Sequence, residues 1–301
     1  MKKKSISIND RNLSISNPEK VLYPAGGFTK VRVLEYYSRI AQFILPHLKD
    51  RALTLKRYPD GVDREYFFEK RCPAAHPDWV ATAEIPYGKT KKLTACLVNN
   101  LETLIWAANL ASLELHVPLA KAKTYRTPDA VVFDLDPGEG ADILDCAKVA
   151  LILKDLLAKQ KLLGWAKTSG KKGLHLYVPL NSPGVTFEQT KSFSRAVAET
   201  MQAHYPDLVT ARMDKIERRN KVFINWSQND ASKTTVCVYS LRAAEQPYVS
   251  CPLEWPELTK LLKLKKPAAF QFLHSEAVKR AEKHGDLFRE VLSKKQRLPN
   301  L

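Results

Sequence analysis

The sequence predicts a mixed fold of the α/β or α+β class. The chain has 301 residues, of which 45% are hydrophobic, so it can bury a sizeable core. Runs with strand-like patterning and runs with helical patterning follow one another in mixed order along the chain. We see no internal repeat and no disordered linker. We therefore expect one unit over residues 1–301 rather than two domains joined by a tether.

Residue patterns in the first part of the chain predict helices and strands in turn. Apolar residues at helical spacing predict a helix over 31–48 that ends near Pro46. Residues 52–61 are predicted to form a strand that leads into a turn. Residues 98–119 are predicted to form a helix followed by a short strand that ends near His116.

The rest of the chain continues in the same mixed order. The predicted elements are a strand at 130–138 stopped by Pro-Gly, an amphipathic helix at 141–161, a strand, Gly-rich turn and strand over 165–180, a helix at about 187–204, strands at 221–226 and 234–241, and helical patterning over 274–293.

The charge of the chain favours a polyanionic partner. Forty-eight Lys and Arg residues against 32 Asp and Glu leave a formal charge of +16, and residues 259–297 hold eleven basic residues against four acids. Basic surfaces bind nucleic acids by releasing counterions from the phosphates. The alternative is a solvated basic surface without a partner. The charge therefore favours nucleic acid without proving it.

Cysteine usage and the N-terminal sequence indicate a cytosolic protein. The five cysteines form no C-x-x-C pair, so we expect core thiols in a reducing cytoplasm; they are Cys72, Cys96, Cys146, Cys237 and Cys251. The start, MKKKSISIND, lacks the apolar region of a signal peptide. No apolar run approaches the roughly 18 residues that a membrane span needs, so no membrane partner is expected.

Asp134 and Asp136 form the strongest local motif. On a strand, residues two apart point to one face, while Val131, Phe133 and Leu135 would pack on the other. Adjacent carboxylates repel unless a cation joins them, and hard oxygen ligands suit Mg²⁺ or Mn²⁺. A pair of such metals is the usual device for nucleotidyl transfer.

Two alternatives to the metal site stay open. The acids can simply be solvated at a strand end before a turn. The motif also imitates the D-x-D-x-T strand of haloacid-dehalogenase-like phosphatases, although Gly138 stands where that motif has Thr.

Further candidates lie in loops. The turn TSGKKGLH (168–175) suits a triphosphate, because its glycines let N–H groups approach phosphates while Ser169, Lys172 and His175 add donors or charge. It lacks the P-loop pattern and can be an ordinary turn. The candidates for a terminal-phosphate pocket are Asn17, Lys20 and Lys30. Of Phe67 and Phe68, adjacent on an extended segment, one ring is expected in the core and the other against a base.

These blocks, in this order, resemble the polymerase domain of bacterial DNA ligase D, of the archaeo-eukaryotic primase-polymerase superfamily. The resemblance covers nearly the whole chain and runs through SNPEKVLYP, GFTK, LTLKRYPDGV, FFEKRCPAAHPDWV, VNNLETLIWAANLASLELH, VVFDLDPG, TSGKKGLHLYVPL, KVFINWSQN and TVCVYSLRA. It implies one primase-polymerase-type domain with a mixed or antiparallel two-sheet core flanked by helices, and no ligase or nuclease segment.

The resemblance also implies an activity, partners and roles. It implies template-directed addition of nucleotides, preferentially ribonucleotides, at gaps and ends during non-homologous end joining. The substrates would be nucleoside triphosphates, and the cofactors two Mn²⁺ or Mg²⁺ ions. Ku and a DNA ligase are possible partners, and the expected location is the cytoplasm, at the nucleoid. The implied metal ligands are Asp134 and Asp136; the nucleotide-binding residues Ser169, Lys172, His175, His116 and Arg242; the 5′-phosphate residues Asn17, Lys20 and Lys30; and the DNA contacts Phe67, Phe68 and Arg218.

Asn225 departs from the family pattern. The third metal carboxylate of the family lies in K-V-F-I-D-W, and here the catalytic and metal position is Asn225. Compared with a carboxylate, an amide offers only one neutral oxygen to a metal and lacks the negative charge. We expect this loss of charge to impair activation of the primer hydroxyl. Three explanations stay open: an engineered inactive variant, a natural protein that only binds, or substitution by a nearby acid, Asp230 or Asp214. The alternative to a polymerase is therefore a non-catalytic protein that binds DNA ends and assists their synapsis.

Overall fold

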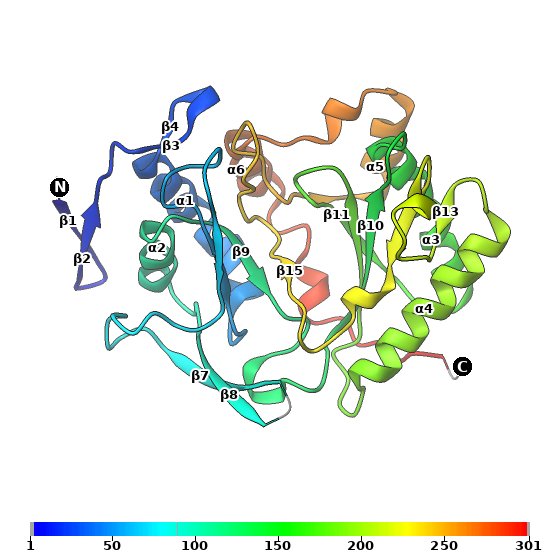
Figure 1. The fold of residues 1–301 in the computed structure, drawn as a ribbon, viewed down its shortest axis with the longest axis horizontal. Coiled ribbons are helices and arrows are strands. Elements are labelled where there is room, and N and C mark those ends of the chain that lie inside the picture. The colour runs from blue at the N-terminus through cyan, green and yellow to red at the C-terminus, as the bar shows by residue number, and fades with distance from the viewer. Residues whose placement is uncertain (1–2, 89, 300–301) are drawn as a thin grey trace. The chain divides into compact units, whose positions relative to one another are not determined.

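The computed structural model describes residues 3–88 and 90–299, which form two compact units (Figure 1). Unit 1 comprises the chain up to Lys123 together with Thr234–Ser250 and Leu273–Asp286. Unit 2 comprises Thr124–Lys233, Cys251–Phe272 and the chain from Leu287 onward. The prediction of a single domain over 1–301 stays a prediction, and each unit is described by itself.

Unit 1 contains a four-stranded sheet with helices packed beside it. The strand order is β15-β9-β5-β6, with all neighbours antiparallel. The sheet strands are β5 (Thr54–Arg57), β6 (Phe67–Glu69), β9 (Ser112–Val117) and β15 (Thr235–Val236); the hairpin strands are β1 (Lys3–Ile8), β2 (Arg11–Ser16), β3 (Val21–Tyr23), β4 (Phe28–Thr29), β7 (Thr82–Tyr87) and β8 (Lys91–Cys96); the helices are α1 (Lys30–Leu48), α2 (Leu101–Asn109) and α6 (His274–His284), with short 3₁₀ turns at Pro24–Gly26 and Ala122–Thr124.

Helix α1 forms because its apolar residues recur on one face. Val33, Tyr37, Ile40 and Ile44 are buried at helical spacing, as the sequence predicted. The expected end near Pro46 is early by two residues, since the helix continues to Leu48. A proline in the last turn removes one backbone donor, while Leu48 still gains burial.

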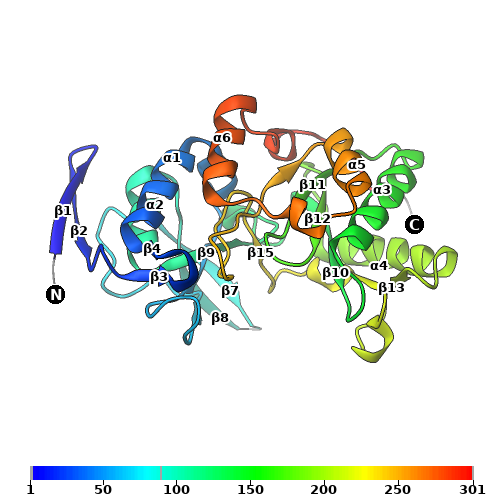
Figure 2. The same ribbon diagram turned by 90° about the horizontal axis from the view of Figure 1, so that it is seen from above.

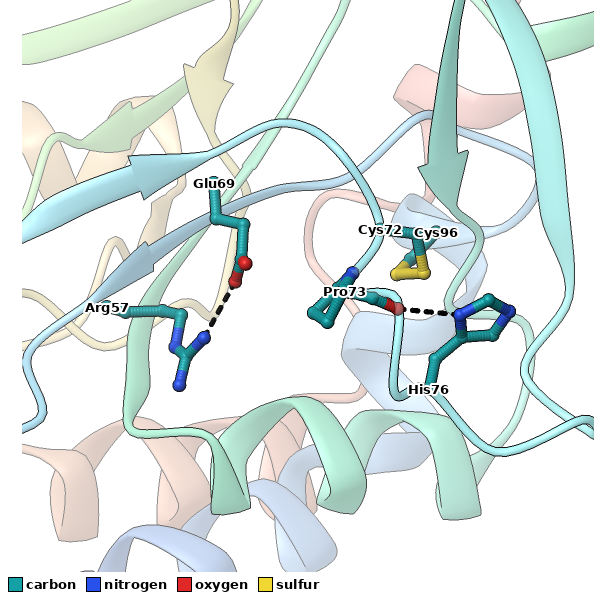
Figure 3. Close-up of a disulfide and its surroundings, with 6 residues drawn as sticks. All are labelled: Arg57, Glu69, Cys72, Pro73, His76 and Cys96. Carbon is teal, nitrogen blue, oxygen red and sulfur yellow. Dashed lines mark hydrogen bonds and ion pairs between the residues drawn. A yellow bond between two sulfur atoms is a disulfide. The ribbon is translucent and has the colours of Figure 1, made fainter.

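A disulfide joins Cys72 to Cys96 at the end of β8 (Figure 3). The expectation of free thiols is therefore wrong for these two cysteines and correct for Cys146, Cys237 and Cys251, which are free and buried. The backbone N–H of Cys72 donates to the carbonyl of Thr94, which brings the two cysteines within reach. Their separation of 24 residues carries no recognisable motif.

Unit 2 contains a six-stranded sheet in the order β13-β14-β10-β12-β11-β16. All neighbours are antiparallel except β13 and β14, which are parallel. Its strands are β10 (Ala130–Pro137), β11 (Trp165–Thr168), β12 (Leu174–Pro179), β13 (Val209–Thr210), β14 (Val222–Asn225) and β16 (Pro252–Leu253); its helices are α3 (Ile143–Lys159), α4 (Phe187–His204) and α5 (Trp255–Lys263), with 3₁₀ turns at Ile216–Arg218, Trp226–Gln228, Pro267–Phe270 and Arg289–Leu292.

One face of the unit 2 sheet forms the apolar core. Val131, Phe133 and Leu135 of β10 are fully buried in a cluster to which α3 and α4 also contribute. Figures 1 and 2 show both helices beside this sheet. Asp142 and Thr186 begin the two helices with capping boxes. The alternation of β10 therefore leaves its acids on the face opposite this core, as predicted.

Two predicted elements differ from the structure. The strand expected over 234–241 is short, because only Thr235–Val236 pairs with β9. The helical patterning over 274–293 is divided, because α6 ends before Gly285, which has a φ of 73°. Helix α5 was not anticipated. None of the described helices combines the length and apolarity needed to cross a bilayer.

The overall class is as predicted. Helices and mainly antiparallel sheets are mixed along the chain, as the order of patterns indicated. The apolar strand at 130–138 and the strand, turn and strand over 165–180 are present with boundaries close to those expected.

Candidate active site

Four polar residues form a row across the unit 2 sheet, on the face opposite the core. Asn225 of β14 is directly opposite Asp134 of β10, Asp134 is opposite His175 of β12, and His175 is opposite Lys167 of β11. Directly opposed residues of neighbouring strands point to the same face. The sheet register therefore joins three predicted site residues with Lys167, which was not predicted.

Asp134 is the centre of this row. Its Oδ1 lies 3.3 Å from Nε2 of His175, and its Oδ2 accepts a hydrogen bond of 3.3 Å from Nδ2 of Asn225. Burial raises the pKa of Asp134, but His175, the ammonium of Lys167 and the Asn225 hydrogen bond together lower it below the ordinary value. Asp134 is therefore held as a carboxylate.

Lys167 sets the protonation pattern of His175. Nζ of Lys167 lies 3.1 Å from Nδ1 of His175, and the lysine is 1% exposed. An ammonium is only a donor, so Nδ1 must accept. The proton of a neutral His175 then lies on Nε2, where it points at Asp134.

Asn225, at the third metal-ligand position of the predicted site, has its amide oriented with the NH₂ group, and not the oxygen, toward Asp134. Asn225 directs its NH₂ at Asp134, while its Oδ1 accepts a 2.8 Å hydrogen bond from Ser227, whose own hydroxyl accepts from Lys233 at 2.7 Å. Asp136 lies two residues from Asp134 on the same face of β10. Within residues 3–88 and 90–299, no group of three or more His, Cys, Asp or Glu side chains is arranged to hold a metal.

The two acids considered as substitutes have other partners. Asp230 binds Lys191 at 2.8 Å and Ser232 at 2.7 Å, and these hydrogen bonds lower its pKa well below the ordinary value. Asp214 accepts from the backbone N–H of Ile216 at 2.9 Å. The explanation that a nearby acid replaces the carboxylate is therefore not supported.

The turn between β11 and β12 is organised by Ser169. Its hydroxyl oxygen accepts from the N–H groups of Lys171 at 3.3 Å and Gly173 at 3.1 Å. A Cβ at Gly173 would lie 2.1 Å from the carbonyl oxygen of Leu135, so only glycine allows this approach to β10. Lys172 is exposed at the tip. The predicted phosphate loop is thus fixed beside the strand that carries Asp134.

The other two nucleotide-binding candidates, His116 and Arg242, meet in unit 1 around Glu114. Nε2 of His116 lies 2.9 Å and Nε of Arg242 lies 3.4 Å from Oε2 of Glu114. Burial lowers the pKa of His116, although Glu114 opposes this shift. Glu114 was missed by the sequence analysis, and its signal is an acid between two apolar residues of a strand, two positions before a histidine.

Asn17, Lys20 and Lys30 are also brought together in unit 1. The N–H of Lys30 donates to the carbonyl of Lys20, and the N–H of Lys20 donates to the carbonyl of Asn17. Nζ of Lys30 donates to the carbonyl and hydroxyl of Ser16 at 2.7 and 3.0 Å. Lys20 pairs with Asp60 at 2.6 Å. The predicted phosphate candidates therefore form one local cluster.

Lys30 has an unusual environment for a lysine. It is 5% exposed, and burial first, then the charges of Lys20 and Arg57, lower its pKa to about 8. Like charges gathered around a buried ammonium are unfavourable without an anion. The cluster is suited to an anion such as a phosphate.

The aromatic pair differs from its expectation. Phe67 is 43% and Phe68 is 54% exposed, so neither ring enters the core. The guanidinium of Arg57 lies 5.1 Å from the ring of Phe67, and the ammonium of Lys56 lies 5.2 Å from that of Phe68 and 4.1 Å from that of Tyr66. These cation–π contacts of Arg57 and Lys56 stabilise the exposed positions of the two phenylalanine rings. Both rings are available to a ligand.

Arg218 lies on the loop that precedes β14 in unit 2. Its guanidinium stacks 3.7 Å from the ring centre of Phe223 and donates to the carbonyl of Met213 at 2.5 Å. A Cβ at Gly138 would meet the Arg218 carbonyl at 1.8 Å, so the loop packs against the end of β10. Arg218 is thereby placed beside the strand of Asp134.

The chain is similar to proteins of one family. Residues 29–288 match the family model of the LigD primase-polymerase domain. The chain is 40% identical over 275 residues to the multifunctional non-homologous end joining protein LigD of Mycolicibacterium smegmatis, covering 91% of the chain and 35% of the relative. It is 34% identical over 250 residues to the bifunctional protein LigD of Bacillus subtilis, covering 83% of the chain and 40% of the relative.

A solved structure gives the same result. The polymerase domain of Mycobacterium tuberculosis ligase D in complex with DNA is 37% identical, with a TM-score of 0.85, and the match covers 94% of this chain and 99% of that one. The chain thus spans less than half of the length of the curated relatives named above. The family model, the relatives and the solved structure agree: the chain belongs to the LigD primase-polymerase domain family.

Proposed function

We propose that this chain is a template-directed nucleotidyltransferase that fills gaps and extends DNA ends during non-homologous end joining. The observation that carries the proposal is the row of Asn225, Asp134, His175 and Lys167 across the sheet, in a chain of the LigD primase-polymerase family. The relatives are end-joining proteins by name, and the solved relative is bound to DNA.

Asp134 of this row, together with Asp136 two residues further along β10, suits a divalent cation. Both acids lie on one face of β10 and supply the hard oxygens that Mn²⁺ or Mg²⁺ prefers. Asn225 fits less well, because its NH₂ faces Asp134 and its oxygen accepts from Ser227. The set fits one cation better than the two that the family pattern implies.

A divalent cation held by Asp134 and Asp136 would supply the positive charge that activates the primer 3′-hydroxyl and neutralises the pyrophosphate leaving group. The chain's own residues bind and orient the nucleoside triphosphate. In unit 2, Ser169 and Gly173 hold the turn that presents Lys172. In unit 1, Glu114 holds His116 and Arg242, the two further nucleotide-binding candidates. Position 225 then lacks one negative charge, which lowers the rate of the chemical step more than nucleotide binding.

Recognition of DNA ends is assigned to the cluster of Asn17, Lys20 and Lys30. A 5′-phosphate bound at this cluster would offset the repulsion between the ammonium groups of Lys20 and Lys30. The exposed rings of Phe67 and Phe68 would stack on unpaired bases. The expected partners are gapped or broken duplexes with a 5′-phosphate, Ku and a DNA ligase, in the cytoplasm with the nucleoid.

Primer extension tests this function. A gapped duplex with a 5′-phosphate is incubated with Mn²⁺ and ribonucleotides, beside the same duplex with deoxyribonucleotides. Template-dependent addition is expected for Asn225→Asp, weaker addition for the unchanged chain, and none for Asp134→Ala. Addition that is equal for Asp134→Ala and the unchanged chain would contradict the assignment of the site.

The second candidate is a non-catalytic protein that binds DNA ends and assists synapsis. The observation in its favour is the Asn225 amide, which stabilises Asp134 by a hydrogen bond without any cation. This candidate predicts tight binding of 5′-phosphorylated ends by both the unchanged chain and Asn225→Asp, with no nucleotide added by either one.

A further inference from the structure

We propose that Glu114 is a positioning residue for the nucleotide site, because it fixes the tautomer of His116 and the orientation of Arg242. The inference rests on the proposed nucleotide binding by these two residues. Glu114 would not itself touch the nucleotide, since its side chain is 0% exposed.

The two oxygens of Glu114 have separate sets of partners. Oε1 accepts from the backbone N–H of Ala243 at 3.1 Å and the hydroxyl of Tyr58 at 3.3 Å, and lies 3.7 Å from Nζ of Lys56. Every one of these partners is a donor. Oε1 is therefore committed to holding the carboxylate in place.

The other oxygen faces the nucleotide-binding candidates. Oε2 lies 2.9 Å from Nε2 of His116 and 3.4 Å from Nε of Arg242. An ionised carboxylate only accepts, so Nε2 of His116 must carry a proton. Nδ1 of a neutral His116 is then an acceptor, and the guanidinium of Arg242 forms an ion pair with the same oxygen of Glu114.

The surroundings explain why a carboxylate rather than an amide is needed. In a Glu114→Gln variant, the donors of Tyr58 and Ala243 keep the amide oxygen on their side, so the amide NH₂ faces His116 and Arg242. This NH₂ would repel the Arg242 guanidinium, and Nε2 of His116 would have to accept instead of donate. The variant therefore reverses the tautomer with almost no change of volume.

If Glu114 had only a structural role, its removal would have different effects. A carboxylate that only neutralises Lys56 and Arg242 would affect stability when removed, without selecting a tautomer of His116. Glu102 gives a matched control, because it is another buried acid of unit 1, 6% exposed, that accepts from Asn9 at 3.1 Å. Glu102→Gln removes the same charge away from His116.

The experiment uses the whole chain labelled with ¹⁵N-histidine, together with ATP titration by calorimetry in the absence of DNA. In the unchanged chain we expect His116 to be protonated at Nε2. Glu114→Gln should move the proton to Nδ1 and weaken ATP binding by about ten- to a hundredfold, the value of a hydrogen bond to a charged group. Glu102→Gln should change neither measurement.

Two results would overturn the inference. One is a His116 spectrum that is the same in Glu114→Gln as in the unchanged chain. The other is an ATP affinity that Glu114→Gln and Glu102→Gln reduce equally. Because the tautomer is read without nucleotide, an unchanged chain that binds no ATP contradicts the proposed function and leaves the tautomer measurement to decide the role of Glu114.

Discussion

Asn225 donates a hydrogen bond of 3.3 Å to the carboxylate of Asp134, directly across two neighbouring strands. A carboxylate at this position would instead face Asp134 with a like charge, which is unfavourable until a cation binds between them. The amide thus stabilises the pair of side chains in the absence of a metal and lowers their affinity for a cation.

Asn225→Asp is therefore expected to bind Mn²⁺ more tightly than the unchanged chain. The added carboxylate contributes both a charge and a hard oxygen ligand. Titration of free Mn²⁺ by electron paramagnetic resonance measures this directly. Asn220→Asp, a change at an exposed asparagine of the same unit, is the control and should leave the affinity unaltered. Equal gains in the two variants would indicate only general charge attraction.

Removing the ammonium of Lys167 is also expected to raise the affinity of the Asp134 site for Mn²⁺. Lys167 is one of the groups that lowers the pKa of Asp134, and its positive charge competes with any cation nearby. Lys167→Met should therefore raise Mn²⁺ affinity, while His175 loses the donor to its Nδ1. Lys167→Arg keeps the charge and serves as the control. A loss of Mn²⁺ binding in Lys167→Met alone would contradict this prediction.

The preference for a 5′-phosphate should depend on pH through Lys30. Its pKa is lowered to about 8 by burial and by the charges of Lys20 and Arg57, so the ammonium is present below pH 8 and lost above it. A phosphate monoester is already a dianion over this range. The affinity ratio of 5′-phosphate to 5′-hydroxyl duplex should therefore fall between pH 7 and 9.

Substitution separates Lys30 from other titrating groups. Lys30→Arg stays charged throughout this range, so its ratio should be flat. Lys20→Ala removes a repelling charge and should move the midpoint to higher pH. Fluorescence anisotropy with the two duplexes measures each ratio. A pH dependence that Lys30→Arg leaves intact would assign the effect to another group.

The disulfide should contribute measurably to the stability of unit 1. It joins Cys72 to Cys96 across a sequence separation of 24, and a loop of this length stabilises a fold by about 3.5 kcal/mol in the chain-entropy treatment. Cys72→Ser should lower the free energy of unfolding in urea by about this amount. Dithiothreitol should have the same effect on the unchanged chain and no further effect on the variant.

Local sequence was sufficient for the parts of the site that lie on one element. The alternation in β10 determined that Asp134 and Asp136 share a face while Phe133 is buried, because side chains alternate along every strand. The same logic located the turn with Ser169. The family resemblance added the significance of Asn225, which no local pattern indicated.

Tertiary structure decided which of these side chains meet. Sheet register, which depends on pairing between distant strands, placed Lys167 and Asn225 on either side of His175 and Asp134. The contact of Glu114 with Arg242 and the joining of Cys72 to Cys96 likewise depend on chain folding. A buried charge is stable only with partners. Here those partners come from segments far apart in the sequence, and no local pattern shows that these segments lie close together in the fold.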